Sequence, residues 1–224
     1  MSLVNSTLVE VTHLSPNCSP RTHKIDTITI HCVVGQVSAE TLGRLFGETS
    51  YQASSNYGVD TDGRVGLYVS EANRSWCSSN AENDNRAVTI EVASDTFHPY
   101  KVNKAAFDAL LDLVTDVCHR NGIEKLVWSN NKEDRINHRN GCNMTCHRDF
   151  ANKACPGDYL YEREETIAET VNERLKRMKG AADAPFPETL YRVQVGAFKV
   201  RQNAENLKAE LEAKGYTPFI VTYK

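Results

Sequence analysis

The 224 residues amount to about one and a half domains of average size, so we expect a main domain and a smaller second unit. The 26 Lys and Arg residues against 29 Asp and Glu residues give a net charge of −3, which excludes a general attraction to nucleic acid or anionic membranes. A hydrophobic content of 40% with 25% charged residues is typical of a globular chain. No run of about 18 apolar residues is present, and the N-terminus lacks the apolar segment of a secretory signal. We therefore expect no membrane insertion, and synthesis in the cytoplasm without a recognisable signal peptide.

The first 95 residues carry the signals of at least four strands. Residues 25–34 form a β-branched run of the kind found in strands buried on both faces, and Ser38 is placed to cap a short helix that ends at Gly47. Residues 57–59 and 65–69 flank an Asp-Gly turn, which predicts a hairpin. Residues 87–92 predict another strand.

Helical periodicity begins after residue 100. Apolar residues recur every three or four positions over residues 102–120, and Gly122 ends the predicted helix. A strand is expected at 125–128, then a polar loop rich in Cys and His, then a charged helix over 158–179. The pattern predicts an α/β fold with a central mixed β-sheet flanked by helices.

The composition changes at residue 180. Small residues and prolines at 180–188 predict a linker between a main domain at 1–179 and a small module at 189–224. Within this module, a strand at 190–198, an amphipathic helix at 201–214 and a second strand at 218–223 predict a short βαβ segment, too small to bury a core by itself.

Cysteine content is the unusual feature of the composition. Seven cysteines cannot all pair within the chain, and three of them lie close to His138 and His147. His31 stands in an otherwise apolar strand, while His147 and Cys155 share one loop. Two imidazoles, one thiolate and an open position match the needs of a catalytic zinc ion.

These residues resemble a known family. A strand histidine in Thr-Ile-His-Cys, the hairpin from Ser54 to Gly63, and the segment His-Arg-Asp-Phe-Ala-Asn-Lys-Ala-Cys-Pro-Gly are similar to the zinc-dependent N-acetylmuramoyl-L-alanine amidases of type 2, which include relatives of the peptidoglycan recognition proteins and phage endolysins. The resemblance covers about residues 20–165. It implies Zn²⁺ bound by His31, His147 and Cys155, and cleavage of the amide between N-acetylmuramic acid and L-alanine in bacterial peptidoglycan.

The resemblance also implies two catalytic groups. Glu91, an acid within an apolar strand, matches the glutamate that acts as base in the bacterial lysins, and Lys153 matches the lysine that faces the substrate carbonyl. The chemistry is consistent, because zinc lowers the pKa of bound water toward about 7, a carboxylate can accept its proton, and an ammonium can stabilise an oxyanion.

Other positions depart from the family or match it loosely. Some members use a tyrosine near the hairpin as an additional catalytic group, but Ser55 or Asn56 occupies that region here. Glu91 is therefore the main candidate for the catalytic base. The usual Ser-Trp-His reads Ser-Trp-Cys here. Trp76 is a candidate floor of the substrate groove or a core residue, and Asn85 is a candidate peptide contact.

The C-terminal module resembles a second family. Val-Gln-Val-Gly-Ala-Phe followed by a helix is similar to the opening of a sporulation-related (SPOR) repeat, a peptidoglycan-binding module. Only the first half of a repeat is present, so the alternative is a tail that packs on the main domain. Together the two resemblances predict an endolysin or autolysin that acts on the wall after release from the cell.

Two rival interpretations stay open at this level. One is a domain of the same fold that binds muropeptides without cleaving them, although the presence of Cys155 argues against it. The other is a closed structural zinc site made of Cys142, Cys146, His138 and Cys155, which leaves His31 without a role. Cys142 and Cys146 are alternatively a disulfide pair or free thiols. The sequence does not fix the oligomeric state.

Overall fold

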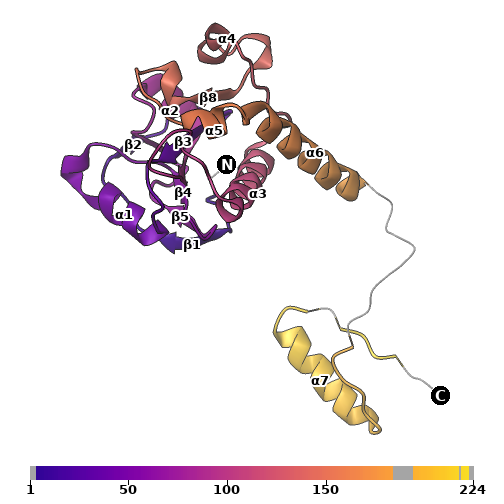
Figure 1. Ribbon diagram of the computed structural model, residues 1–224. Helices are drawn as coiled ribbons and strands as arrows, with labels where there is room; N and C mark the ends of the chain where they lie inside the picture. Colours follow the sequence, from indigo (N-terminus) through magenta and orange to yellow (C-terminus); the bar gives the residue numbers. More distant parts are fainter. Residues whose placement is uncertain (1–3, 184–193, 217, 222–224) are drawn as a thin grey trace. The chain divides into compact units, whose positions relative to one another are not determined.

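The computed structural model describes residues 4–183, 194–216 and 218–221 (Figure 1). It divides the chain into two compact units, Met1–Ala182 and Asp183–Lys224. The helices and strands of the first unit are, in chain order, β1 (Val9–Thr12), β2 (Cys18–Pro20), β3 (Thr27–Val33), α1 (Ala39–Gly47), β4 (Tyr57–Val59), β5 (Val65–Leu67), β6 (Asn73–Ser75), α2 (Ala81–Arg86), β7 (Ala87–Ala93), α3 (Lys104–Asn121), α4 (Lys132–Ile136), β8 (Met144–Cys146), α5 (Gly157–Tyr161) and α6 (Glu164–Asp183).

A mixed sheet forms the centre of the first unit, as the sequence predicts. Its strand order is β1-β5-β4-β7-β3-β8, and β2 and β6 pair separately. All neighbouring pairs in the large sheet are parallel except the β4–β5 hairpin. β3 and β7 pair over seven residues, from Thr27 opposite Ala87 to Val33 opposite Ala93. This long register fixes which side chains of the two central strands are neighbours.

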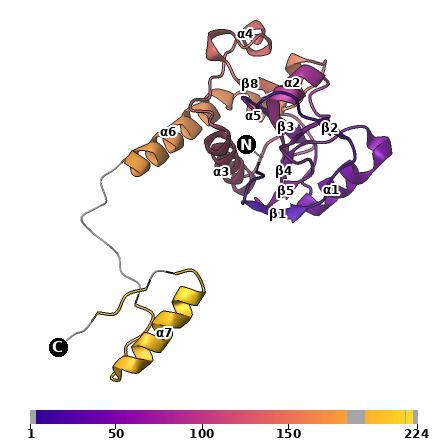
Figure 2. The same ribbon diagram turned by 180° about the vertical axis from the view of Figure 1, so that it is seen from behind.

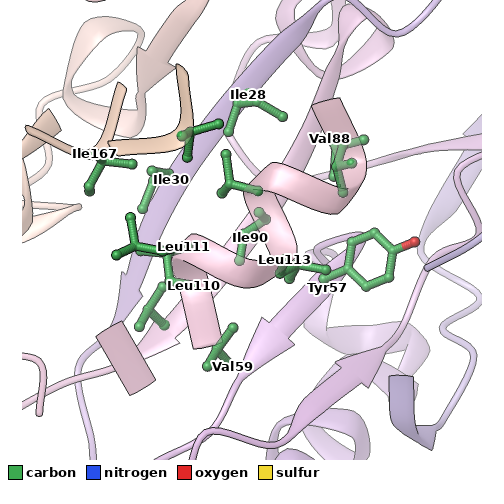
Figure 3. Packing of buried hydrophobic residues seen from close by; sticks show 14 of the residues in the cluster. Ile28, Ile30, Tyr57, Val59, Val88, Ile90, Leu110, Leu111, Leu113 and Ile167 are labelled. Atoms are coloured by element: carbon green, nitrogen blue, oxygen red, sulfur yellow. The ribbon is translucent and has the colours of Figure 1, made fainter. Parts of the chain in front are cut away.

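One face of the sheet carries the apolar core. Alternate residues of the central strands, such as Ile30 and Ile90, pack with α3 through Leu110 and Leu113 and with α6 through Ile167 (Figure 3). These five side chains are 0% exposed. Helices α3 and α6 lie side by side in both views (Figures 1 and 2), and Arg174 of α6 forms an ion pair with Asp112 of α3. Burial of this face supplies the main hydrophobic stabilisation of the unit.

The opposite face of the central strands is buried but polar. Thr29 Oγ1 and Thr145 Oγ1 are 2.8 Å apart, Asn83 Nδ2 donates to Thr29 Oγ1, and the backbone N–H of Asn56 donates to Thr89 Oγ1. These groups are satisfied by one another, which removes the cost of burying them. Strand β3 is therefore buried on both faces, as predicted, but its second face consists of polar groups that are paired by hydrogen bonds.

Helix α1 covers the same polar side near β4 and β5. Ser38 caps it as predicted, because its Oγ accepts from the backbone N–H of Thr41. Leu42 and the ring of Tyr68 lie so close to the sheet that glycine is required beneath them: a Cβ on Gly66 would be 2.2 Å from the Tyr68 hydroxyl, and one on Gly58 would be 2.8 Å from Leu42 Cδ2. Small residues in β4 and β5 thus allow the helix to approach.

The strand predicted at 125–128 is wrong. Side-chain amides hold this backbone instead of a neighbouring strand: Asn172 donates to the Leu126 carbonyl and accepts from its N–H, and Asn143 Oδ1 accepts from the Val127 N–H. The helix predicted at 158–179 is divided into α5 and α6. Arg163 lies at the division, where its guanidinium stacks on the Tyr159 ring at 4.0 Å.

The second unit contains one described helix, α7 (Arg201–Ala213), which confirms the predicted helix at 201–214. Residues 194–198 and 218–221 carry no strand. The remaining parts of the two predicted strands, at 190–193 and 222–223, and most of the predicted linker lie outside the described residues. The predicted boundaries, with the main domain ending at residue 179, the linker at 188 and the small module beginning at 189, stay predictions.

Candidate metal centre

His31 and Glu91 are neighbours because β3 and β7 are paired in register. The two residues lie directly opposite each other in the parallel ladder, so their side chains leave the polar face of the sheet together. His31 is 0% exposed, and its Nδ1 lies 4.0 Å from Glu91 Oε1. The sequence placed both residues in strands, and the pairing brings them to one point.

The loop after β8 brings the other two predicted ligands to His31. β8 pairs with β3 up to Cys146 opposite Ile30, so His147 leaves the sheet beside His31. The loop folds back on itself, because the Arg148 N–H donates to the Cys155 carbonyl at 3.1 Å. Cys155 is thereby returned to the end of β3, where its Sγ accepts from the Cys32 N–H at 3.4 Å.

His31, His147 and Cys155 have the geometry of ligands to one ion. Their ligand atoms all lie within 4.8 Å of one another, and Cys155 Sγ is 3.4 Å from His31 Nδ1. Two ligands of a tetrahedral zinc ion are separated by about 3.5 Å when the bonds are about 2.0 Å to nitrogen and 2.3 Å to sulfur. The observed sulfur–nitrogen separation fits such an ion.

The electrostatics also suit a cation. Burial, together with the neighbouring His147, lowers the pKa of His31 to about 3, so this imidazole is neutral and able to bind metal at neutral pH. Burial and the nearby Lys153 charge lower the pKa of His147. In the absence of a metal, the Cys32 thiol and burial raise the pKa of Cys155, an effect that a bound cation would oppose. Two buried atoms, His31 Nε2 and Glu91 Oε2, have no hydrogen-bond partner.

The carboxyl group of Glu91, beside His31, has a raised pKa. Burial raises its pKa to about 7, while a hydrogen bond from Cys77 opposes the shift. A carboxyl group with a pKa near the working pH can both accept and return a proton.

Lys153 lies in the loop that carries His147 and Cys155. It is exposed and lines a shallow hollow with Lys132, Arg148 and Asn152. Its ammonium is near enough to His147 to affect the pKa of that imidazole. The hollow is therefore lined by three cationic side chains, those of Lys132, Arg148 and Lys153.

The side chains of Trp76 and Asn85, the two predicted substrate contacts, form hydrogen bonds within the protein. Trp76 directly precedes Cys77 and is partly buried, and its Nε1 donates to Ser19 Oγ at 2.9 Å. Asn85 lies before the first residue of β7, and its amide is bonded to Thr22 at both ends: Oδ1 accepts from the backbone N–H and Nδ2 donates to Oγ1. Asn85 lies in the last turn of α2, and from Ala87, the first residue of β7, four residues of extended strand lead on to Glu91, about 13 Å. The structure does not bring Asn85 to the metal centre.

Sequence reasoning missed the residues that support the loop. The carboxylate of Asp149 accepts from the Cys146 N–H at 3.0 Å and from both Nε and Nη2 of Arg135, at 2.9 and 2.5 Å. Both side chains are almost fully buried. Ser79 Oγ also lies 2.9 Å from His147 Nε2. The Asp of His-Arg-Asp could have indicated a supporting residue in the sequence. Its partner, Arg135, lies in α4, a helix that the sequence did not predict.

The rival structural site is not formed. Among the described residues, only two groups of three His, Cys, Asp or Glu side chains have ligand atoms within 4.8 Å, and neither contains Cys142, Cys146 or His138. The Cys142 thiol donates to the Val127 carbonyl, and His138 Nδ1 faces the Cys142 carbonyl. All seven cysteines are free, so Cys142 and Cys146 are not paired.

Comparison with known proteins places these residues in a family. The model of the N-acetylmuramoyl-L-alanine amidase family matches residues 21–158, and the SPOR domain model matches residues 187–224. No curated protein matches the chain. No helix in the described parts of the chain is long and apolar enough to cross a membrane.

Several solved structures share the fold of the first unit. A mutant endolysin from Bacillus subtilis is 14% identical with a TM-score of 0.54, and the alignment covers 72% of this chain and 97% of that one. A crystal structure of an AmpD derivative is 17% identical with a TM-score of 0.54, covering 75% and 99%. The Drosophila peptidoglycan recognition protein SA is 16% identical with a TM-score of 0.52, covering 69% and 90%. At these identities the likeness shows the fold alone.

Proposed function

Because the chain belongs to the N-acetylmuramoyl-L-alanine amidase family, and is thereby a peptidoglycan amidase, we propose that it works with a zinc ion held by His31, His147 and Cys155. The substrate bond is the amide between the lactyl group of N-acetylmuramic acid and L-alanine. The observation that carries this proposal is the convergence of three ligand atoms from two distant segments within 4.8 Å. When bound, zinc would supply a hydroxide nucleophile at neutral pH by lowering the pKa of water.

The residues around the ligands supply the proton transfers. Glu91, with Oε1 beside His31, accepts the proton of the attacking water and later delivers it to the departing amine of L-alanine. One water is consumed, and the products are a carboxylate on the lactyl group and a free amino terminus. Lys153, at the exposed rim, stabilises the negative charge that develops on the carbonyl oxygen.

The second unit serves as a wall-binding module in this proposal. Its match to the SPOR domain supports binding of peptidoglycan by residues 189–224, joined through a linker at 180–188 to a catalytic domain at 1–179. The enzyme then acts on the cell wall after release, as an endolysin or autolysin.

Binding of muropeptides without cleavage is the less favoured alternative. A protein that only binds has no need of Cys155 beside His31, or of a partly buried Glu91 with a pKa of about 7.

Digestion of purified peptidoglycan followed by mass spectrometry tests the function. The zinc-loaded protein is expected to release stem peptides with free L-alanine amino termini and to leave the glycan intact. His31→Ala should abolish this release, and His119→Ala, an exposed histidine on α3, should not change it. Glycan fragments, cleavage within the stem peptide, or full activity of His31→Ala would contradict the proposal.

A further inference from the structure

His147 differs from His31 in the partners of its ring. His31 is fully buried, whereas His147 is half-buried, and its Nε2 lies 2.9 Å from the hydroxyl oxygen of Ser79. An imidazole that binds a metal through one nitrogen carries its proton on the other, and that N–H needs an acceptor. Because Nε2 already has Ser79 as a partner, Nδ1 is the nitrogen that remains for an ion.

Ser79 has a backbone conformation that a serine rarely adopts. Its φ is 63°, in the left-handed region where most side chains other than that of asparagine are disfavoured. Such a residue persists only where its surroundings impose the conformation, and such residues cluster at functional sites. Ser79 is also exposed, so burial in a core does not explain its placement.

Hydrogen bonds hold the neighbours of Ser79 on both sides. Before it, the backbone N–H groups of Cys77 and Ser78 donate to the carboxylate of Asp84, at 2.9 and 3.1 Å, and Asp84 is 2% exposed. After it, the side chain of Asn80 caps α2. The chain turns between these two fixed points, which imposes the left-handed conformation on Ser79.

Asn83 connects the loop of Ser79 to the strand that leads to His147. Its Nδ2 donates to Ser78 Oγ at 3.1 Å, and its Oδ1 accepts from Thr145 Oγ1, in β8, at 2.9 Å. Asn83 is buried, so this connection is shielded from water. The hydroxyl and the imidazole are therefore held against each other by the fold itself, which is the preorganisation that a metal site requires.

We propose that Ser79 is a positioning residue of the metal centre: its hydroxyl accepts the Nε2–H of His147 and so presents Nδ1 to the ion shared with His31 and Cys155. The inference rests on the proposed function. Acceptors of this kind fix the tautomer and the ring orientation of a metal-binding histidine. A hydroxyl is a neutral acceptor, so Ser79 orients the ring without adding negative charge beside the ion.

The tautomer of His147 is the first readout. In the full chain without metal, isotopically labelled at the histidine nitrogens, long-range proton–nitrogen correlation spectra distinguish Nε2–H from Nδ1–H imidazoles. Comparison with His147→Gln identifies the signals of His147. We expect the Nε2–H form alone in the unchanged chain. Ser79→Ala and Ser79→Gly remove the acceptor, and each should give a mixture of the two forms, as in a histidine exposed to water.

Zinc affinity is the second readout, measured by competition with an indicator. Ser79→Ala and Ser79→Gly should both bind zinc about 10-fold more weakly than the unchanged chain, at the lower end of the usual effect, because the lost acceptor is neutral. Glycine adopts the left-handed conformation freely, so Ser79→Gly separates loss of the hydroxyl from strain in the backbone. Ser79→Asn, which tolerates this conformation and offers an amide oxygen, should recover most of the affinity.

The outcomes separate the two proposals. An unchanged affinity or an unchanged tautomer in both Ser79→Ala and Ser79→Gly would overturn the role of Ser79. Loss of affinity in Ser79→Ala alone would overturn it too, because the effect would then come from the backbone. Absence of zinc from the unchanged protein, or a zinc affinity that His147→Gln leaves intact, would overturn the zinc site itself.

Discussion

The buried ion pair of Arg135 and Asp149 offers a demanding test of how the metal-binding loop is supported. In Asp149→Ala, the guanidinium of Arg135 loses two hydrogen bonds to the carboxylate, at 2.9 and 2.5 Å, and the Cys146 N–H loses its acceptor. The side chains are only 2% and 0% exposed, so water cannot replace the lost partner without opening the loop. Breaking one side of a buried pair costs about 3–5 kcal/mol.

This cost is a large part of the stability of the unit. Natural domains have about 5–15 kcal/mol of unfolding free energy, and each kcal/mol corresponds to roughly 2–4 °C in a domain of 150–250 residues. We therefore expect the melting temperature of Asp149→Ala to fall by roughly 6–20 °C. Zinc affinity should fall by about 10- to 100-fold, as is typical when the residues that support metal ligands are removed.

Urea unfolding and calorimetry measure the stability, and competition with a zinc indicator measures the affinity. The double variant Arg135→Met/Asp149→Ala removes the stranded charge while keeping an apolar group against the Trp128 ring, which Arg135 now covers at 4.4 Å. It should be more stable than Asp149→Ala alone. A loss below about 1 kcal/mol in the single variant, or no recovery in the double variant, would refute the reasoning.

Three further predictions concern other parts of the first unit. Glu91→Gln should lower amide hydrolysis by about 10²- to 10⁴-fold with zinc content unchanged in metal analysis, and a variant that loses its zinc would show that Glu91 acts in binding instead. Glu164 is fully buried with both oxygens unpaired, and burial raises its pKa well above the usual value. Above about pH 4.3 the folded state therefore keeps a proton on Glu164 that the unfolded state has lost, so the free energy of unfolding falls as the pH rises. Urea titrations should show that Glu164→Gln is more stable than the unchanged chain at pH 7 and that this advantage shrinks toward pH 4. A difference in stability that stays constant with pH would contradict this. Gly66→Ala should cost about 1–3 kcal/mol in thermal unfolding because of the Tyr68 ring, whereas Gly35→Ala, whose new Cβ would lie 3.4 Å from its nearest neighbour, should be close to neutral.

Local patterns were sufficient to predict the elements with strong signals. The β-branched run of β3, the Ser38 cap and the Asp-Gly hairpin each depend on neighbours in the sequence, and the structure confirms them. The segment 125–128 has an equally apolar pattern, but the amides of Asn143 and Asn172 occupy the groups that a strand would use. Such long-range partners leave no trace in local periodicity.

In the candidate site too, some residues could be predicted from the sequence and others depend on long-range contacts. His31, His147 and Cys155 could be selected because their residue types and spacing resemble a known motif, and the structure brings them together. Ser79 carries no such signal. Its contact with His147 depends on the packing of the loop before α2, which is fixed by buried Asp84, and that contact cannot be inferred from spacing alone.

The proposed ligands lie far apart along the chain, and this has a consequence for biosynthesis. His31 emerges from the ribosome early, but His147 and Cys155 follow only when most of the first unit has been made. Chains grow at about 5–20 residues per second, so the complete ligand set does not exist until roughly 6–25 s after His31 is added. If the proposed zinc site is correct, metal uptake is among the last events in the maturation of this unit, and nascent chains stalled before residue 147 should retain no zinc through this site.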